Sequence, residues 1–79
     1  MDRYLIFDLG ASNGRAVVAN VEGEKVEFDV IHRFDNIPVF ANDGEYFWDI
    51  LRIYSEIKTG LKKCYKKYGK VNSMAIDSW

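Results

Sequence analysis

The sequence predicts an α/β fold with a mixed β-sheet, in the order β-β-β-α-β. Three observations support this prediction. Three segments of strand character, joined by short turns, fill residues 4–34, as in an antiparallel meander. Residues 50–68 then repeat apolar side chains at helical spacing. Residues 71–77 return to apolar strand character.

The three predicted strands of the meander differ in pattern. Residues 4–7 form a continuous apolar run, which suits a strand covered on both faces. Residues 14–22 form the second strand, and a tight turn at Gly23 leads into the third. Residues 25–34 alternate apolar and acidic side chains, the pattern of a half-buried strand. The alternating apolar residues are Val26, Phe28 and Val30.

The predicted helix follows a loop over residues 36–44 that holds the single proline. Asp49 is a candidate N-cap, and Gly69 suits the C′ position. Aromatic Tyr46-Phe47-Trp48 is expected to pack at the helix entry. The expected apolar stripe is Ile50, Tyr54, Ile57, Leu61, Cys64 or Tyr65, and Tyr68. The opposite, solvated face is expected to carry Arg52, Glu56, Lys58, Lys62, Lys63, Lys66 and Lys67.

Length and composition suit one small globular domain. Its 79 residues are 48% hydrophobic and 15% aromatic, and a chain of this size buries roughly 60–65% of its unfolded surface. The single cysteine excludes a disulfide scaffold and a Cys-based zinc site. No apolar run is long enough to span a membrane, and the N-terminus does not resemble a signal peptide. We therefore expect a cytoplasmic location and no membrane partner.

Charge is divided unevenly along the chain. Residues 1–50 hold ten acidic and four basic side chains, whereas residues 51–79 hold two acidic and seven basic ones. The basic excess lies on one helix face, and the helix aromatics fall on the apolar stripe. A nucleic-acid surface would need basic residues spread over several elements, with exposed aromatics among them. The pattern predicts a solvated helix face and no nucleic-acid partner.

The most informative stretch is Asp8-Leu9-Gly10-Ala11-Ser12-Asn13-Gly14-Arg15. A carboxylate at the end of a strand is followed by a glycine-flanked turn, whose backbone can approach a ligand and whose N–H groups can bind an anion. Ser12 and Asn13 can add donors, Arg15 can offset phosphate charge, and Asp8 can hold Mg²⁺. Asn13-Gly14 is also a frequent hairpin signal, so a plain hairpin and a phosphate loop both remain open. The stretch is neither a Walker A loop nor a dinucleotide fingerprint.

A second carboxylate, Asp77, follows the last predicted strand. If the first and last strands are parallel neighbours, Asp8 and Asp77 emerge at the same sheet edge, where ligands bind. Asp77 could equally start a turn or cap a helix. Trp79 could stack on a sugar ring or belong to a core. His32 lacks a second His or Cys at ligand spacing and is expected to have a structural or surface role. Cys64 lies on the apolar stripe of the helix and is expected to pack in the core.

Four motifs in matching order make the sequence resemble the FGGY carbohydrate kinases, within the actin-like (ribonuclease H-like) ATPase superfamily. They are residues 8–15, Ile31-His32-Arg33-Phe34 followed by Asn36, Trp48-Asp49, and residues 73–79. The Ala11-Ser12 pair, where most of the family has threonine, is typical of the branch that acts on L-rhamnulose. The resemblance implies that residues 1–79 are the N-terminal part of the first kinase domain, with the rest of that domain and the second domain absent.

The resemblance also implies a function. It implies ATP-dependent, Mg²⁺-dependent phosphorylation of L-rhamnulose at its 1-hydroxyl in rhamnose breakdown. Residues expected to contact ATP phosphates are Ala11, Ser12, Asn13, Gly14 and Arg15. Asp8 would lie at the metal, and Asp77 and Trp79 at the sugar pocket. The family's catalytic Asp lies beyond Trp79, so these 79 residues alone are expected to be inactive, and to self-associate through an exposed sheet edge.

Three alternatives remain at this point. Another ketose or polyol kinase of the same family would share these motifs. A ribonuclease H-like nuclease would use Asp8 and Asp77 as half of a two-metal site. A non-catalytic, actin-like sugar sensor would share the fold without the reaction.

Overall fold

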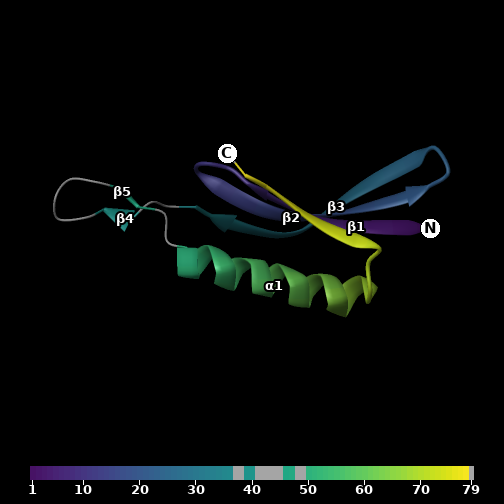
Figure 1. Cartoon of the computed structure of the whole chain (residues 1–79). Helices are drawn as coiled ribbons and strands as arrows, with labels where there is room; N and C mark the ends of the chain where they lie inside the picture. Colours follow the sequence, from purple (N-terminus) through teal and green to yellow (C-terminus); the bar gives the residue numbers. More distant parts are fainter. Residues whose placement is uncertain (37–38, 41–45, 48–49, 79) are drawn as a thin grey trace.

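The molecule is a β-sheet with one long helix packed across it (Figure 1). The computed structural model describes residues 1–36, 39–40, 46–47 and 50–78. The elements are β1 (Asp2–Leu9), β2 (Asn13–Glu22), β3 (Lys25–Asp35), β4 (Val39–Phe40), β5 (Tyr46–Phe47), α1 (Ile50–Tyr68) and β6 (Ser73–Ser78). Each main element lies where the sequence predicts it, with ends that differ by at most two residues.

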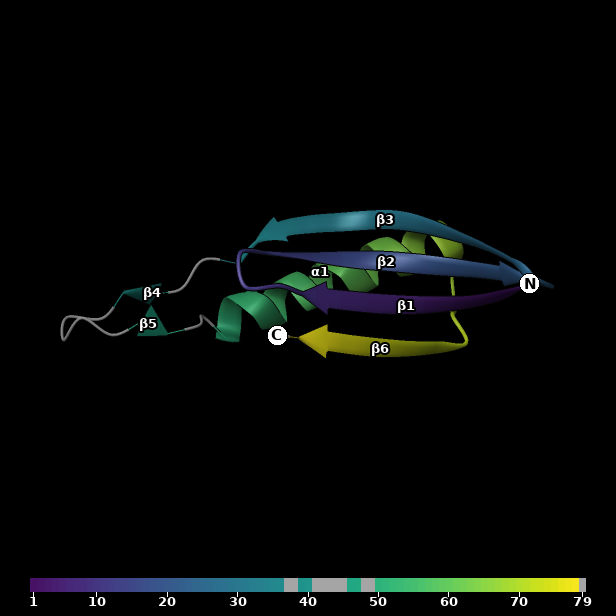
Figure 2. The same ribbon diagram turned by 90° about the horizontal axis from the view of Figure 1, so that it is seen from above.

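The main sheet is mixed, with the strand order β3-β2-β1-β6. β1 pairs antiparallel with β2 and parallel with β6, and β2 pairs antiparallel with β3. The arrowheads of β1 and β6 therefore point to the same end of the sheet (Figure 2). The predicted α/β class and the order of the main elements are confirmed. One prediction is wrong in part, because the loop over residues 36–44 contains β4, which pairs antiparallel with β5.

Two glycines end elements in the left-handed region of backbone space. Gly23 has φ 62° and begins the two-residue turn between β2 and β3, as predicted. Gly69 has φ 76°, and its N–H donates to the Tyr65 carbonyl oxygen at 2.8 Å. Glycine takes this conformation without the strain that a Cβ brings, so Gly69 closes the helix at the predicted C′ position.

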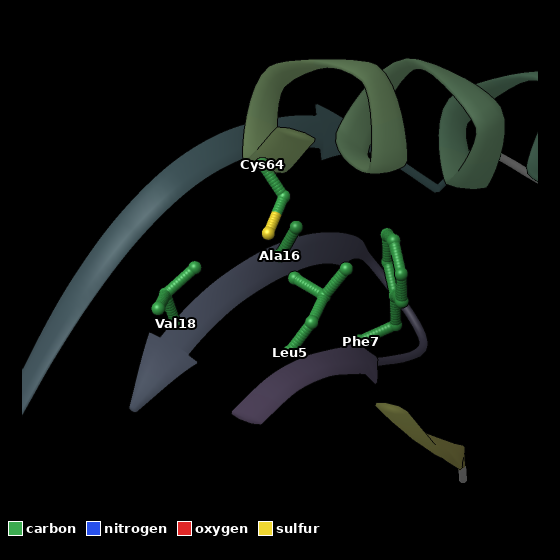
Figure 3. Close-up of a cluster of buried hydrophobic side chains, with 5 residues drawn as sticks. All are labelled: Leu5, Phe7, Ala16, Val18 and Cys64. Atoms are coloured by element: carbon green, nitrogen blue, oxygen red, sulfur yellow. The ribbon is translucent and has the colours of Figure 1, made fainter. Parts of the chain in front are cut away.

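The core lies between the helix and one face of the sheet. Leu5, Phe7, Ala16, Val18 and Cys64 form its central cluster. Figure 3 shows Cys64 pointing from the helix toward the sheet, while Leu5 and Phe7 point from β1 toward the helix. Burial raises the pKa of the Cys64 thiol, which keeps it neutral. The predicted structural role of Cys64 agrees with this position.

Part of the predicted helix stripe is wrong. Ile53, Ile57 and Cys64 pack on the sheet, whereas Tyr54, Leu61 and Tyr65 are exposed. The reason is Gly60, which lies on the packed face and has no side chain to hold the helix away. A Cβ there would lie 2.6 Å from the Phe7 ring, so the helix comes closest to the sheet at Gly60.

The apolar residues at alternate positions of β3 are also exposed. Val26, Phe28 and Val30 face away from the helix, and Phe28 retains 69% of its accessible surface. The register shifts between Ala16 and Val17, where β3 carries an extra residue. This β-bulge changes which residues face the helix, so the strand alternation by itself could not identify the covered side.

Candidate functional site

Two carboxylates meet at one end of the sheet. Asp8 of β1 lies directly opposite Asp77 of β6 in the parallel register. Neighbouring strands are about 4.8 Å apart, and paired residues point to the same face of a sheet. The predicted meeting of Asp8 and Asp77 at the carboxyl ends of parallel strands is confirmed. The face that they share is the open one, away from α1.

Arg15 joins these carboxylates from β2. It is the register partner of Asp8, and its Nε and terminal nitrogen each lie 3.1 Å from Asp8 Oδ2. A shallow cavity of about 420 Å³ begins at this group and continues over the apolar open face. Its lining is Ile6, Asp8, Arg15, Val17, Phe28, Val30 and Asp77. A cation, two anions and an apolar floor thus line one hollow.

The carboxylates of this hollow fit a Mg²⁺ ion whose coordination shell is completed by phosphate oxygens. Mg²⁺ takes one or two carboxylates and fills its other positions with water and phosphate oxygens. Asp8 and Asp77 supply that number of carboxylates. In the described part of the chain, no three His, Cys, Asp or Glu side chains gather into a complete metal site. Two carboxylates are a donor set that suits an ion whose other positions are filled by phosphate oxygens and water.

The β1–β2 turn, residues 10–12, follows Asp8 by two residues at the same end of the sheet. The Gly10 N–H donates to the Asn13 carbonyl at 2.8 Å, and Ala11 and Ser12 form the exposed tip. Within the described residues, the backbone N–H groups of Ala11 and Ser12 donate no hydrogen bond. Free N–H groups at such a turn are donors that an anion can use.

Asn13-Gly14 does not form the turn. Both residues belong to β2, and neither has a positive φ, which a primed turn centred on them would require. The hairpin is present, but its tip, Ala11-Ser12, lies two residues earlier in the chain. Position 14 needs a glycine because a Cβ there would lie 2.3 Å from the Phe34 ring.

Sequence reasoning missed the role of Asn36. Its side chain is 2% exposed, and its Nδ2 donates to the Gly10 carbonyl at 2.7 Å. Its backbone N–H donates to the Ser12 carbonyl at 3.0 Å. The only signal in the sequence is an asparagine two residues after the apolar end of a strand, which is also a common loop start.

Two further polar clusters join the helix to β3 on the covered face. Lys63 Nζ lies 2.9 Å from His32 Nδ1, which must accept because an ammonium only donates. His32 Nε2 then faces Glu56 Oε2 at 3.5 Å without a hydrogen bond. These contacts are structural and lie away from Asp8, in agreement with the role expected for His32.

The second cluster centres on Asp29. Lys67 Nζ donates to Asp29 Oδ2 at 2.6 Å, and the Tyr68 hydroxyl donates to the same oxygen. The hydrogen bond from Lys67, followed by that from Tyr68, lowers the pKa of Asp29 below its usual range. Part of the helix face expected to be solvated therefore pairs with the sheet.

Some predicted residues lie outside the described residues. They are Pro38, Trp48, the candidate N-cap Asp49, and Trp79 at the expected sugar pocket. Among the elements that the structure describes, no helix is long and apolar enough to cross a lipid bilayer.

The chain is similar to proteins of known name along its whole length. It is 42% identical over 79 residues to a rhamnulokinase of Halalkalibacterium halodurans. It is 40% identical over 76 residues to the rhamnulokinase of Oceanobacillus iheyensis, and 39% identical over 74 residues to that of Mannheimia succiniciproducens. The resemblance to carbohydrate kinases is confirmed.

The similarity covers a small part of each relative. The chain spans 16% of the length of the first two proteins and 15% of the third. No protein-family profile matches the chain. All three relatives bear the name rhamnulokinase.

Proposed function

We propose that this chain is the N-terminal part of the first domain of a cytoplasmic, ATP-dependent kinase that converts L-rhamnulose to L-rhamnulose 1-phosphate. The observation that carries the proposal is the register of Asp8 against Asp77 in a chain 42% identical to a rhamnulokinase. Two carboxylates beside a donor-rich turn suit a reaction in which charge on phosphate must be held and neutralised.

On the nucleotide side, residues 11–15 bind phosphate in this proposal. The N–H groups of Ala11 and Ser12, and the side chains of Ser12 and Asn13, are donors at the exposed turn. Arg15 can exchange its bond to Asp8 for a phosphate oxygen, since both partners are partly exposed. Asp8 would hold Mg²⁺, which supplies charge neutralisation at the phosphates when bound.

On the sugar side, Asp77 and Trp79 bind the acceptor in this proposal. Asp77 is exposed at the end of β6, so its carboxylate is available to accept hydrogen bonds from sugar hydroxyls. The register that sets Asp77 beside Asp8 supports a sugar bound next to the phosphate group. Holding the two substrates in contact is the main part of catalysis in phosphoryl transfer.

The catalytic base is proposed to come from another part of the protein. The chain spans 15–16% of the length of its relatives, and the other groups that converge on the reacting atoms would lie outside it. The free edge of β6 is proposed to make the isolated 79 residues self-associate, because an unpaired strand can pair with another chain.

A coupled assay of ATP consumption tests the proposal. The full-length protein should consume ATP only when L-rhamnulose is present, and NMR of the product should place the phosphate on the 1-hydroxyl. The 79-residue chain alone should show no turnover above blank. Equal rates with an unrelated ketose, or sugar-dependent turnover by the isolated chain, would contradict the proposal.

A further inference from the structure

Asn36 binds the β1–β2 turn at two points. One hydrogen bond runs from its side-chain amide to the Gly10 carbonyl, and the other runs from its backbone N–H to the Ser12 carbonyl. The residue lies 26 positions from Gly10 in sequence, at the end of β3. A buried asparagine that donates to two carbonyls of a turn, one from its side chain and one from its backbone, holds the turn in one conformation, because each broken bond would leave a buried polar group unpaired.

The two bonds also set the direction of the turn N–H groups. In a trans peptide the carbonyl and the following N–H point to opposite sides of the peptide plane. No cis peptide is present among the described residues. Since the Gly10 and Ser12 carbonyls point toward Asn36, the N–H groups of Ala11 and Asn13 point away from it.

Resting on the proposed function, we propose that Asn36 is the positioning residue of the phosphate-binding turn. It touches neither substrate, and acts by fixing the peptide planes of the turn so that the free N–H of Ala11 points toward the nucleotide phosphates. Phe34 assists from the same strand end, because its ring occupies the space above Gly14 and fixes the start of β2. The phosphate site is thereby set by β3 as well as by the turn.

Asn72 provides a matched control at the opposite end of β1. Its backbone N–H donates to the Arg3 carbonyl at 2.8 Å, and its Oδ1 accepts from the Arg3 N–H at 2.8 Å. Asn36 and Asn72 thus each make two hydrogen bonds with backbone groups. Asn72 is exposed whereas Asn36 is 2% exposed, so the control matches the hydrogen bonds and not the burial. Only Asn36 makes its bonds at the turn, so a loss of affinity for MgATP should appear only in the Asn36 variant.

The experiment compares Asn36→Ala and Asn72→Ala in the full-length protein by calorimetric titration with MgATP and by steady-state kinetics. Asn36→Ala should weaken MgATP binding about tenfold, the effect of one lost buried hydrogen bond, while the KM for L-rhamnulose stays within about twofold. Asn72→Ala should lower the unfolding temperature but leave MgATP affinity unchanged. If Asn36→Ala does not fold, Asn36→Ser replaces it under the same criteria, because its hydroxyl is too short to reach the Gly10 carbonyl.

The outcomes separate this inference from the proposed function. Equal MgATP affinity in the Asn36 and Asn72 variants, or an equal loss for nucleotide and sugar, would overturn the positioning role. A wild-type protein that binds MgATP without phosphorylating L-rhamnulose would overturn the proposed function, and the comparison of the two variants would still decide the inference. A wild-type protein that does not bind MgATP would overturn both.

Discussion

The two faces of the sheet are built from alternate residues of the same strands, yet they differ in chemistry. The covered face presents Leu5, Phe7 and Val18 to the helix, and these side chains are at most 1% exposed. The open face presents Asp8 and Arg15, together with apolar side chains that remain accessible. Phe7 and Asp8 are neighbours in sequence and belong to opposite faces.

The contrast shows how one strand can serve stability and binding together. Burial of apolar side chains against α1 stabilises β1 and β2, and this holds the alternate residues at fixed positions on the other face. A shift of register by one residue would exchange the two sets, so the packed core also determines the geometry of the site. Substitutions on the two faces should therefore have separable effects.

Phe7→Ala on the covered face should have the largest effect. The side chain is 0% exposed, so truncation removes its packing and leaves a cavity beneath Gly60. We expect a loss of about 3–5 kcal/mol in the free energy of unfolding of the full-length protein. Urea denaturation followed by tryptophan fluorescence measures it, and a loss under about 1 kcal/mol would show that this face is not the core.

Asp8→Asn, one residue later on the open face, should act on activity and leave stability nearly unchanged. The amide keeps the size of the side chain but removes the charge proposed to hold Mg²⁺ and to pair with Arg15. We expect kcat to fall roughly a hundred- to a thousandfold. A coupled assay with L-rhamnulose measures it, with the unfolding temperature as control; unchanged kcat would contradict the assignment of Asp8.

Gly60→Ala tests how closely the helix approaches the covered face. Alanine is the better helix former by about 1 kcal/mol, but its Cβ would lie 2.6 Å from the Phe7 ring. The steric cost should exceed the gain, with a net loss of about 1–2 kcal/mol in the free energy of unfolding. Chemical denaturation checks the sign. Increased stability would mean that the helix can move outward without cost.

The pH dependence of Asp29 should be the smallest effect. Its pKa is lowered in the folded state by hydrogen bonds from Lys67 and then Tyr68, so the ionised form favours folding. That contribution is complete above the unfolded pKa of about 3.9 and is lost as pH falls through the lower folded value. The difference in unfolding temperature between wild type and Asp29→Asn should be constant from about pH 5 to pH 7, and should shrink below about pH 4. If the difference in unfolding temperature persists at low pH, packing of the side chain and not its charge causes the difference.

Much of the fold follows from local signals. The apolar run at residues 4–7, the Gly23 turn and the Gly69 cap each specify their structure through short-range sterics, and each is where the sequence predicts it. The packed face of the helix was predicted only in part, and the alternation along β3 did not identify its covered side. Both depend on single contacts between distant residues, at Gly60 and at the bulge opposite Val17.

The candidate site also has features that the sequence predicted and features that it did not. The residue types of the turn, and the pair Asp8 and Asp77, could be selected from the sequence because each carboxylate follows an apolar strand. The position of the turn at Ala11-Ser12 and the role of Asn36 could not, because a residue 26 positions away supplies the hydrogen bond. The hydrogen bonds from Asn36 determine the position of the turn, and the local preference of Asn-Gly for a turn does not.

By itself the sequence determined the order of elements, the residues that carry charge at strand ends, and the resemblance to sugar kinases. These depend on neighbouring residues and on residue type, which the chain carries before it folds. Only the tertiary structure decided which face of each strand is covered, that Asp8 lies opposite Asp77, and that Asn36 holds the turn. Those features depend on register and on close packing between segments far apart in the chain, which no local pattern specifies.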